Sequence, residues 1–181
     1  MPLQGKTIGI LVEEQYQDLE VWYPFYRLRE AGARVVAIGT AKKEYKGKFG
    51  YPITAERDVR EVNADELDGI VVPGGFAPDF LRRHEAPAAL VRKVFEQGKL
   101  VAAICHGPWL LVDAGVLKGK KATSFFAIRR DVENAGAAWS DVEVVVDGNL
   151  VTSRKPDDLP AFCREIIKLL ARTNKKTFID V

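Results

Sequence analysis

Histidine and cysteine are scarce in this chain: its 181 residues include only two of each. Two cysteines do not make a disulfide framework, and together with two separated histidines they do not match the spacing of a metal site. Charge of one sign is not in excess either, because 27 lysines and arginines oppose 25 acidic residues. The resulting net charge of +2 gives no indication of a nucleic-acid or membrane surface. We therefore expect no metal, no nucleic acid and no membrane among the partners of this protein.

Long hydrophobic runs are also missing. The apolar runs fall far short of a bilayer span, and the first residues, MPLQGKTIGILVEE, lack the apolar stretch of a secretory signal. The glycine pair after Pro73 lacks the Lys-Ser/Thr ending of a phosphate-binding loop, so we expect no cofactor. These absences predict a reduced, cytoplasmic protein. The length predicts a single domain over 1–181, in which 173–181 form a tail whose Phe178 and Ile179 indicate docking.

Short β-rich apolar runs alternate with longer helical patterns along the sequence. Strands are predicted at 6–12, 34–40, 67–75 and 100–105, with a hairpin joined at Asp147-Gly148 within 142–154. Helices are predicted at 19–32, 86–99, 127–137 and 157–172, and a helix followed by a turn at 107–120. This alternation is typical of an α/β fold, a mostly parallel sheet with helices on both faces. Ligands of such sheets bind beyond the carboxyl ends of the strands, where Pro73-Gly74-Gly75 and Cys105-His106-Gly107 lie.

Cys105 ends an apolar strand and precedes a helix. Helix N-termini carry partial positive charge and free N–H groups, which favour the nucleophilic thiolate form of a cysteine. Gly107 permits the tight strand-to-helix turn of a nucleophile elbow, which would expose the sulfur. Packing in the core is the other interpretation, because free cysteine is among the most buried residue types. Cys163 lies mid-helix in an amphipathic pattern, which predicts packing alone.

His106 follows Cys105 directly in the sequence. It could activate the thiol, give a proton to a leaving group, or only hydrogen-bond within the turn. A reaction through an anionic intermediate needs N–H donors, and the backbone amides of Gly74, Gly75 and His106 are the candidates. His84 is predicted to be exposed and is given no role.

Three segments together carry a resemblance to a known family. The stretch AICHGPWLLVDAGVLKGKKATSF, with IVVPGGFAPDFLR upstream and EVVVDGNLVTSRKPDDLPAFCREIIKLL downstream, resembles the ThiJ/PfpI family over residues 6–171. That family includes intracellular cysteine peptidases of the PfpI type and stress proteins described as protein deglycases. The resemblance implies a flavodoxin-like three-layer sandwich, the fold of class I glutamine amidotransferases. An amidotransferase itself is not expected, because no histidine follows His106.

The resemblance also implies roles for individual residues. Cys105 is the nucleophile, His106 is its partner, and the acid that follows PGGFAP is Asp79. In similar proteins this acid reaches the histidine of a neighbouring subunit, so the site would be completed by assembly into a dimer or a hexamer. The aromatic residues around Trp22 are candidates for such contacts, although burial in the core explains them equally well.

Two positions depart from the family pattern. Relatives have a glutamate after the first strand that hydrogen-bonds the cysteine sulfur, and counting back seven residues from Pro24 places Gln17 there. Glu20 fits a second acidic position of the family. Since glutamine removes like-charge repulsion and cannot titrate, we expect Gln17 to contact the sulfur and Cys105 to stay acidic, with altered turnover. Trp109 stands where relatives often have glutamine, and it either narrows the pocket or packs in the core.

The leading functional interpretation is a cysteine-dependent hydrolase of the PfpI type. Its substrate is either a peptide bond or the adducts that methylglyoxal and glyoxal form on proteins, which would make it a deglycase or glyoxalase. A non-enzymatic alternative is a redox-sensing or chaperone-like stress protein that uses an oxidisable Cys105. An inactive member that keeps the fold for assembly is the third interpretation. Turnover discriminates among them, because an enzyme needs His106 and Asp79 whereas a sensor needs Cys105 and the donors around its sulfur.

Overall fold

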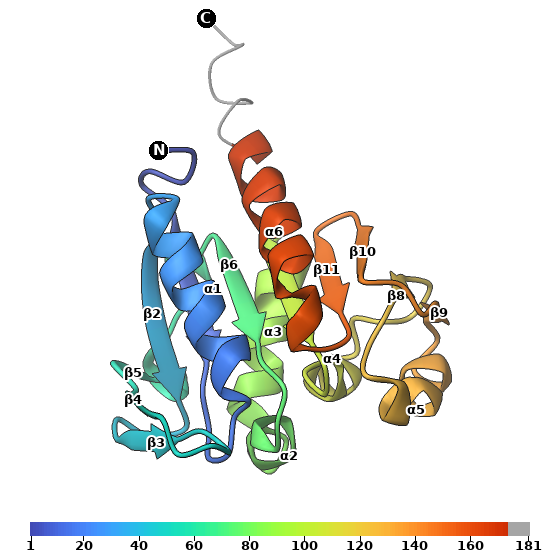
Figure 1. The fold of residues 1–181 in the computed structure, drawn as a ribbon, viewed down its shortest axis with the longest axis horizontal. Helices are drawn as coiled ribbons and strands as arrows, with labels where there is room; N and C mark the ends of the chain where they lie inside the picture. The colour runs from blue at the N-terminus through green and yellow to red at the C-terminus, as the bar shows by residue number, and fades with distance from the viewer. Residues whose placement is uncertain (174–181) are drawn as a thin grey trace, which may run out of the picture.

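A seven-stranded sheet forms the middle layer of the protein, for which the computed structural model describes residues 1–173 (Figure 1). The predicted docking of Phe178 and Ile179 lies outside the described residues. Within the sheet every strand pairing is parallel except that of β10 with β11. The strands, in spatial order, are β10 (Val144–Asp147), β11 (Leu150–Ser153), β7 (Leu100–Ile104), β6 (Gly69–Val72), β1 (Thr7–Leu11), β2 (Arg34–Gly39) and β5 (Arg57–Asp58).

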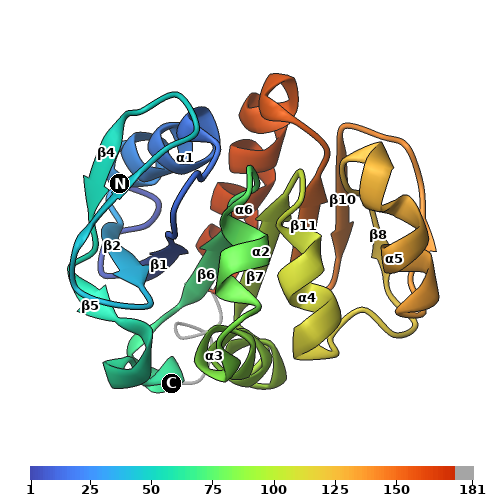
Figure 2. The same cartoon turned by 90° about the horizontal axis from the view of Figure 1, so that it is seen from below.

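Helices cover both faces of this sheet (Figures 1 and 2). One face carries α1 (Asp18–Glu30) and α6 (Leu159–Thr173), which contact each other. The other face carries α2 (Ala77–Leu81), α3 (Glu85–Glu96), α4 (Pro108–Ala114) and α5 (Arg129–Asn134). Two small two-stranded sheets lie outside these layers. One pairs β3 (Glu44–Lys46) with β4 (Pro52–Thr54), and the other pairs β8 (Lys121–Ala122) with β9 (Ala138–Trp139). Four 3-10 turns join the elements: Val59–Glu61, Ala64–Glu66, Phe126–Ile128 and Pro156–Asp158.

The strands are apolar throughout because each of their faces is buried. In β7, Ala102 and Ile104 belong to the core under α1 and α6, whereas Val101 and Ala103 belong to the core under α3 and α4. Successive side chains of a strand point to opposite faces, so a strand buried on both sides needs an unbroken apolar run. The predicted α/β three-layer sandwich is confirmed.

Several boundaries differ from the sequence prediction. Within the helix and turn predicted at 107–120, the helix ends at Ala114, because Gly115 adopts a left-handed φ of 70° and caps it. The hairpin predicted within 142–154 is present, with Asp147 paired to Leu150. The short helix α2 was not predicted, since five residues are too few to show a helical period. Within residues 1–173, no helix combines the length and the apolar character that crossing a bilayer needs.

Four parallel strands end at the same edge of the sheet, and the segments that follow them meet there. Tyr16, after β1, forms an isolated bridge with Gly75, after β6. The Cys105 N–H, after β7, donates to the Ser153 carbonyl at the end of β11. The parallel topology therefore gathers residues from distant parts of the sequence around Cys105.

Candidate active site

Cys105 lies in the turn between β7 and α4, where the chain changes direction sharply. Its φ of 61° is in the left-handed region, which costs a residue with a Cβ about 1–2 kcal/mol. Two hydrogen bonds hold this backbone: Cys105 N–H donates to Ser153 O at 3.0 Å, and Phe125 N–H donates to Cys105 O at 2.9 Å. A Cβ on Gly107 would lie 2.4 Å from the Val72 carbonyl oxygen, so the turn requires glycine there. The predicted elbow geometry is confirmed.

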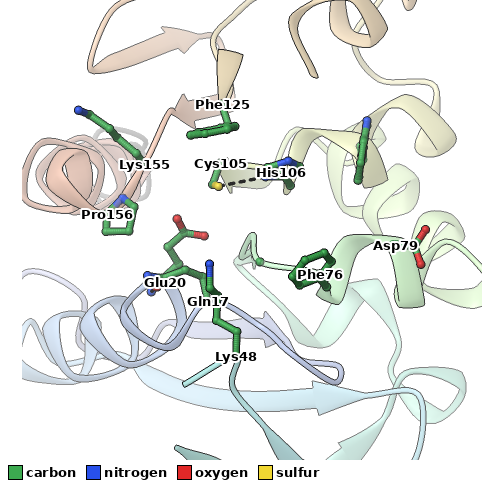
Figure 3. A pocket seen from close by; sticks show the side chains of 12 residues that line it. Gln17, Glu20, Lys48, Phe76, Asp79, Cys105, His106, Phe125, Lys155 and Pro156 are labelled. Atoms are coloured by element: carbon green, nitrogen blue, oxygen red, sulfur yellow. Dashed lines mark hydrogen bonds between the residues drawn. The ribbon is translucent and has the colours of Figure 1, made fainter. Parts of the chain in front are cut away.

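Polar groups surround the Cys105 sulfur, although the residue is only 8% exposed. His106 Nδ1 lies 3.2 Å from Sγ. The backbone N–H groups of Gly75 and His106 also face the sulfur and favour its thiolate form. The third neighbour is the carboxyl group of Glu20, which Figure 3 shows directed toward Cys105 from α1.

Glu20 is fully buried, and its two carboxyl oxygens have different surroundings. Oε2 accepts the Gly74 N–H at 2.7 Å, whereas Oε1 accepts no hydrogen bond from residues 1–173. A Cβ on Gly74 would lie 2.6 Å from Glu20 Oε2 and 3.0 Å from Cys105 Sγ, so the carboxyl and the thiol meet over a glycine. The prediction that the Gly74 N–H serves an anionic intermediate was wrong, because that N–H donates to Glu20.

Burial and charge both shift the pKa values of this pair. Burial raises the pKa of the Glu20 carboxyl from its ordinary 4.5 to about 7. The pKa of the Cys105 thiol is raised to about 12, first by burial and then by the charge of Glu20. The predicted acidic thiol was therefore wrong, because the nearby backbone N–H groups do not offset both effects. Above pH 7, Glu20 is a carboxylate beside a protonated thiol, which places it to accept the thiol proton.

Gln17 is not the residue at the sulfur, contrary to the prediction. It is the N-cap of α1, and its Oε1 accepts the Glu20 N–H at 3.0 Å. The helical period could have identified Glu20, since Glu20, Pro24 and Leu28 recur every four residues on the buried face of α1. Gln17, seven residues before Pro24, precedes the first residue of the helix, whereas Glu20, four residues before Pro24, lies within it.

Replacing Gln17 by alanine is expected to destabilise the fold and leave the thiol unchanged. Loss of an N-cap hydrogen bond lowers the free energy of unfolding by about 1 kcal/mol. Urea unfolding measures this change, and the rate of Cys105 alkylation measures the thiol. Gln17→Ser is the matched control, since a serine hydroxyl also accepts a backbone N–H at an N-cap and adds no charge beside the sulfur. A large change of alkylation rate in Gln17→Ala would show that Gln17 acts on the sulfur after all.

Gly75 occupies a position that admits no side chain. Its φ is 73°, and a Cβ there would lie 2.4 Å from the Gln17 backbone nitrogen and 2.5 Å from the Gln15 carbonyl oxygen. Gly98 has a similar φ of 70° but nothing within 4 Å of its Cβ position. Substitutions at these two glycines therefore distinguish the cost of backbone strain, which both share, from the cost of steric overlap, which only Gly75 has.

We expect Gly75→Ala to destabilise the fold by at least about 3 kcal/mol, from strain and overlap together. Gly98→Ala carries only the left-handed strain, about 1–2 kcal/mol. Urea denaturation of both variants measures the difference. Equal destabilisation by the two substitutions would mean that the turn at 73–76 yields to a side chain.

His106 is packed between two aromatic rings. Its imidazole stacks on Phe125 with ring centroids 5.1 Å apart and meets Trp109 edge to face at 5.1 Å. Burial, followed by the charge of Lys48, lowers the pKa of His106 below its ordinary 6.5. A neutral imidazole at pH 7 has one N–H and one free lone pair, so it can both give and take a proton. Trp109 lines the pocket and is itself held by its indole N–H, which donates to Asp131 at 2.7 Å.

Asp79 lies in the first turn of α2 and lines the same cavity as Cys105. Its carboxylate pairs with Arg83 at 2.5 Å and is half exposed. Among residues 1–173 of a single chain, no hydrogen bond joins Asp79 to His106. The role of Asp79 toward a neighbouring subunit stays a prediction.

The cavity over Cys105 has a volume of about 620 Å³. Aromatic, cationic and polar side chains share its walls (Figure 3): Gln17, Glu20, Lys48, Gly75, Phe76, Asp79, Cys105, His106, Trp109, Phe125, Lys155 and Pro156. His84 lies outside it, at the N-terminus of α3. Cys163 is buried in the core under α6, as predicted. In the described part of the chain, no three His, Cys, Asp or Glu side chains converge as metal ligands do.

Comparison with known proteins finds close relatives over nearly the whole chain. A Thermococcus kodakarensis protein named as a deglycase is 50% identical over 161 residues, which cover 89% of this chain and 97% of the relative. An Escherichia coli protein named protein/nucleic acid deglycase 2 is 45% identical over 169 residues, 92% of this chain and 98% of the relative.

Among solved structures, a two-domain protein of Anabaena variabilis with DJ-1/ThiJ/PfpI-like and ferritin-like domains superposes with a TM-score of 0.89 at 44% identity. The match covers 93% of this chain and 48% of that protein. The family model described as DJ-1/PfpI family matches residues 6–169. The chain belongs to the DJ-1/PfpI family.

Proposed function

We propose that this protein is a cysteine-dependent hydrolase that removes adducts of methylglyoxal and glyoxal from amino and thiol groups, a deglycase. The observation that supports it most is the meeting of the Glu20 carboxyl and the Cys105 thiol over Gly74, with two N–H groups at the sulfur. The names of the relatives, as deglycases, agree with this assignment.

The proposed reaction begins with transfer of the Cys105 proton to the Glu20 carboxylate. The thiolate attacks the carbinol carbon of the adduct, so a C–S bond forms while the bond to the leaving amine or thiol breaks. The proton that Glu20 received passes on to the leaving group through neutral His106, which gives its ring N–H proton to the leaving group as its other ring nitrogen takes one up. Transfer of a proton between the two adjacent carbons then turns the bound hemithioacetal into a thioester. Water cleaves the thioester to a hydroxy acid and restores the thiol, and no external oxidant or reductant is consumed.

The N–H groups of Gly75 and His106 are proposed to hold the negative charge that develops beside the sulfur. Both face Sγ and both belong to turns fixed by backbone hydrogen bonds. Donors fixed before the reaction stabilise developing charge more than donors that must reorient.

Side-chain adducts suit the cavity better than a peptide bond does. Cys105 is 8% exposed and lies behind Phe76, Trp109 and Phe125, which line the cavity. A modified side chain can enter such a space from its tip, whereas a peptide substrate must bring an extended backbone to the sulfur.

Assembly completes the proposed site. The Asp79 carboxylate of a second copy is proposed to hydrogen-bond His106, in a dimer or hexamer of the cytoplasm. Phe76 and Phe126 are 59% and 71% exposed beside the cavity and supply apolar surface for such a contact. Light scattering on the purified chain measures the oligomeric state.

The test of the proposed function is a pair of assays on the purified chain. The hemithioacetal of methylglyoxal and N-acetylcysteine is followed by loss of its absorbance and by formation of lactate, and a fluorogenic peptide is followed in parallel. The deglycase proposal predicts adduct loss matched by lactate. Peptide cleavage without adduct loss would identify a peptidase. Absence of both activities would favour the redox-sensing interpretation of Cys105.

A further inference from the structure

Lys48 stands at the wall of the Cys105 cavity and has no established role. It belongs to the turn between β3 and β4 and lines the cavity beside Gln17 and Glu20 (Figure 3). Its positive charge lowers the pKa of both Glu20 and His106. The positive charge of the ammonium group therefore reaches the part of the cavity in which the reacting compound must lie.

The turn that carries Lys48 is held firmly against the start of α1. The Asp18 carboxylate, on a residue 8% exposed, accepts the N–H groups of Phe49 at 3.0 Å and Tyr51 at 3.1 Å. The Lys48 N–H itself donates to the Tyr16 carbonyl at 2.8 Å. A buried carboxylate thus fixes the backbone just after Lys48, and the Tyr16 carbonyl fixes the N–H of Lys48 itself, which limits the lysine to this side of the cavity.

A second lysine stands on another wall of the cavity. Lys155 follows β11, and the neighbouring Arg154 is fixed by the buried Asp158 at 2.9 Å. The Lys155 ammonium pairs with Asp157, which is 78% exposed, and in Figure 3 it points away from Cys105. Lys155 is therefore the outer cation and Lys48 the inner one.

Few negative charges oppose these lysines. No carboxylate among residues 1–173 forms an ion pair with Lys48 within 4.0 Å. Asp79 is paired with Arg83. Glu20 and Cys105 together hold one negative charge above pH 7, and it lies at the floor of the cavity. The remaining walls are mainly aromatic, so the negative charge at the floor is what opposes the attraction of Lys48 for an anion that enters the cavity.

We propose that Lys48 binds a carboxylate of the compound that reacts at Cys105, with Lys155 as a weaker outer contact. The substrate class that follows from this inference rests on the proposed deglycase function. The substrates are adducts on free amino acids, small thiols or chain ends that carry a carboxylate near the electrophilic carbon. Neutral adducts in the middle of a protein chain are poorer substrates.

Alkylation of Cys105 tests this proposal without any need for turnover. Iodoacetate and iodoacetamide deliver the same electrophilic carbon with the same leaving group, and they differ in one carboxylate. Their rate constants are measured on the Cys163→Ala chain, so that Cys105 is the only thiol, and the ratio is normalised to N-acetylcysteamine. The ratio cancels changes in thiolate fraction, because both reagents react with the same thiolate.

The iodoacetate-to-iodoacetamide ratio is expected to fall about three- to fivefold in Lys48→Gln, the size of a partly screened charge pair. A smaller fall is expected in Lys155→Gln. Lys168→Gln is the matched control, because this lysine of α6 lies outside the cavity and pairs with Glu165. An unchanged ratio in Lys48→Gln, or an equal fall in Lys168→Gln, would overturn the proposal. A chain that shows the fall but removes no adduct would refute the deglycase function and keep the anion site.

Discussion

Replacing Cys105 by alanine is expected to lower the rate of adduct removal by at least about 1,000-fold, as loss of a nucleophile does in other covalent enzymes. Alanine also has a Cβ, so the strain of the left-handed backbone at φ 61° is the same as with cysteine. The two backbone hydrogen bonds of residue 105 are also kept. The fold should therefore survive, and the loss should lie in the chemical step. The measurement is lactate formation from the hemithioacetal of methylglyoxal and N-acetylcysteine.

Cys163→Ala is the matched control for this substitution. Both cysteines are buried and both thiols have pKa values raised to about 12 by burial. Cys163 packs in the core under α6, away from the cavity. We expect its replacement to change turnover by less than about twofold. Comparable losses in the two variants would mean that the effect is on stability and not on a nucleophile.

Replacing Glu20 by glutamine is expected to lower turnover by about 100-fold or more, because it removes the base that accepts the thiol proton. The glutamine carbonyl can still accept the Gly74 N–H, so the geometry of the site is retained. The pKa of Glu20 is about 7, and its carboxylate form is the active one. Turnover of the native chain should therefore rise through pH 7, and this rise should be absent in Glu20→Gln. The same rise in both proteins would assign it to another group.

The same substitution should stabilise the fold at neutral and alkaline pH. Below pH 4.5 the carboxyl is protonated in both the folded and the unfolded chain. Between pH 4.5 and about 7 the unfolded chain releases this proton while the folded chain keeps it, so stability falls as the pH rises. Above pH 7 the full loss remains, up to about 3 kcal/mol for a shift of this size. Urea unfolding near pH 8 should show that Glu20→Gln regains most of this lost free energy of unfolding. A variant less stable than the native chain at that pH would contradict this account.

The opposing effects on stability and turnover have one physical cause. A buried carboxylate with one unpartnered oxygen destabilises the folded chain, and the same unpartnered oxygen is free to accept a proton from sulfur. Activity at this site therefore depends on Glu20, a residue that lowers the stability of the folded chain.

The sequence was sufficient to predict the layers of the fold and the turn at Cys105. Unbroken apolar runs such as 100–104 are required wherever a strand is buried on both faces, so they indicate a parallel sheet directly. The cysteine at the end of such a run, followed by Gly107, indicates the tight turn. The hairpin of β10 and β11 follows equally from its Asp-Gly pair.

The surroundings of the sulfur could not be predicted in the same way. Gln17 and Glu20 are three residues apart, and residues at that spacing lie on the same side of a helix, so the sequence alone does not separate the N-cap residue from the one that reaches the sulfur. The direction of the thiol pKa depends on burial, which a turn motif does not report. That the Gly74 N–H donates to Glu20 follows from two segments brought together by the fold, 54 residues apart in the sequence.

The shared site of Glu20 and Cys105 is tested most directly by titrating the Cys105 thiolate through its ultraviolet absorbance, in the Cys163→Ala chain with and without Glu20→Gln. With Glu20 present, the thiolate should form only at strongly alkaline pH, because burial and the carboxylate charge raise the thiol pKa to about 12. With glutamine in its place, the repulsion is absent and the midpoint should fall. A thiolate already formed below pH 7 in the presence of Glu20, or an unchanged midpoint in the variant, would contradict the account.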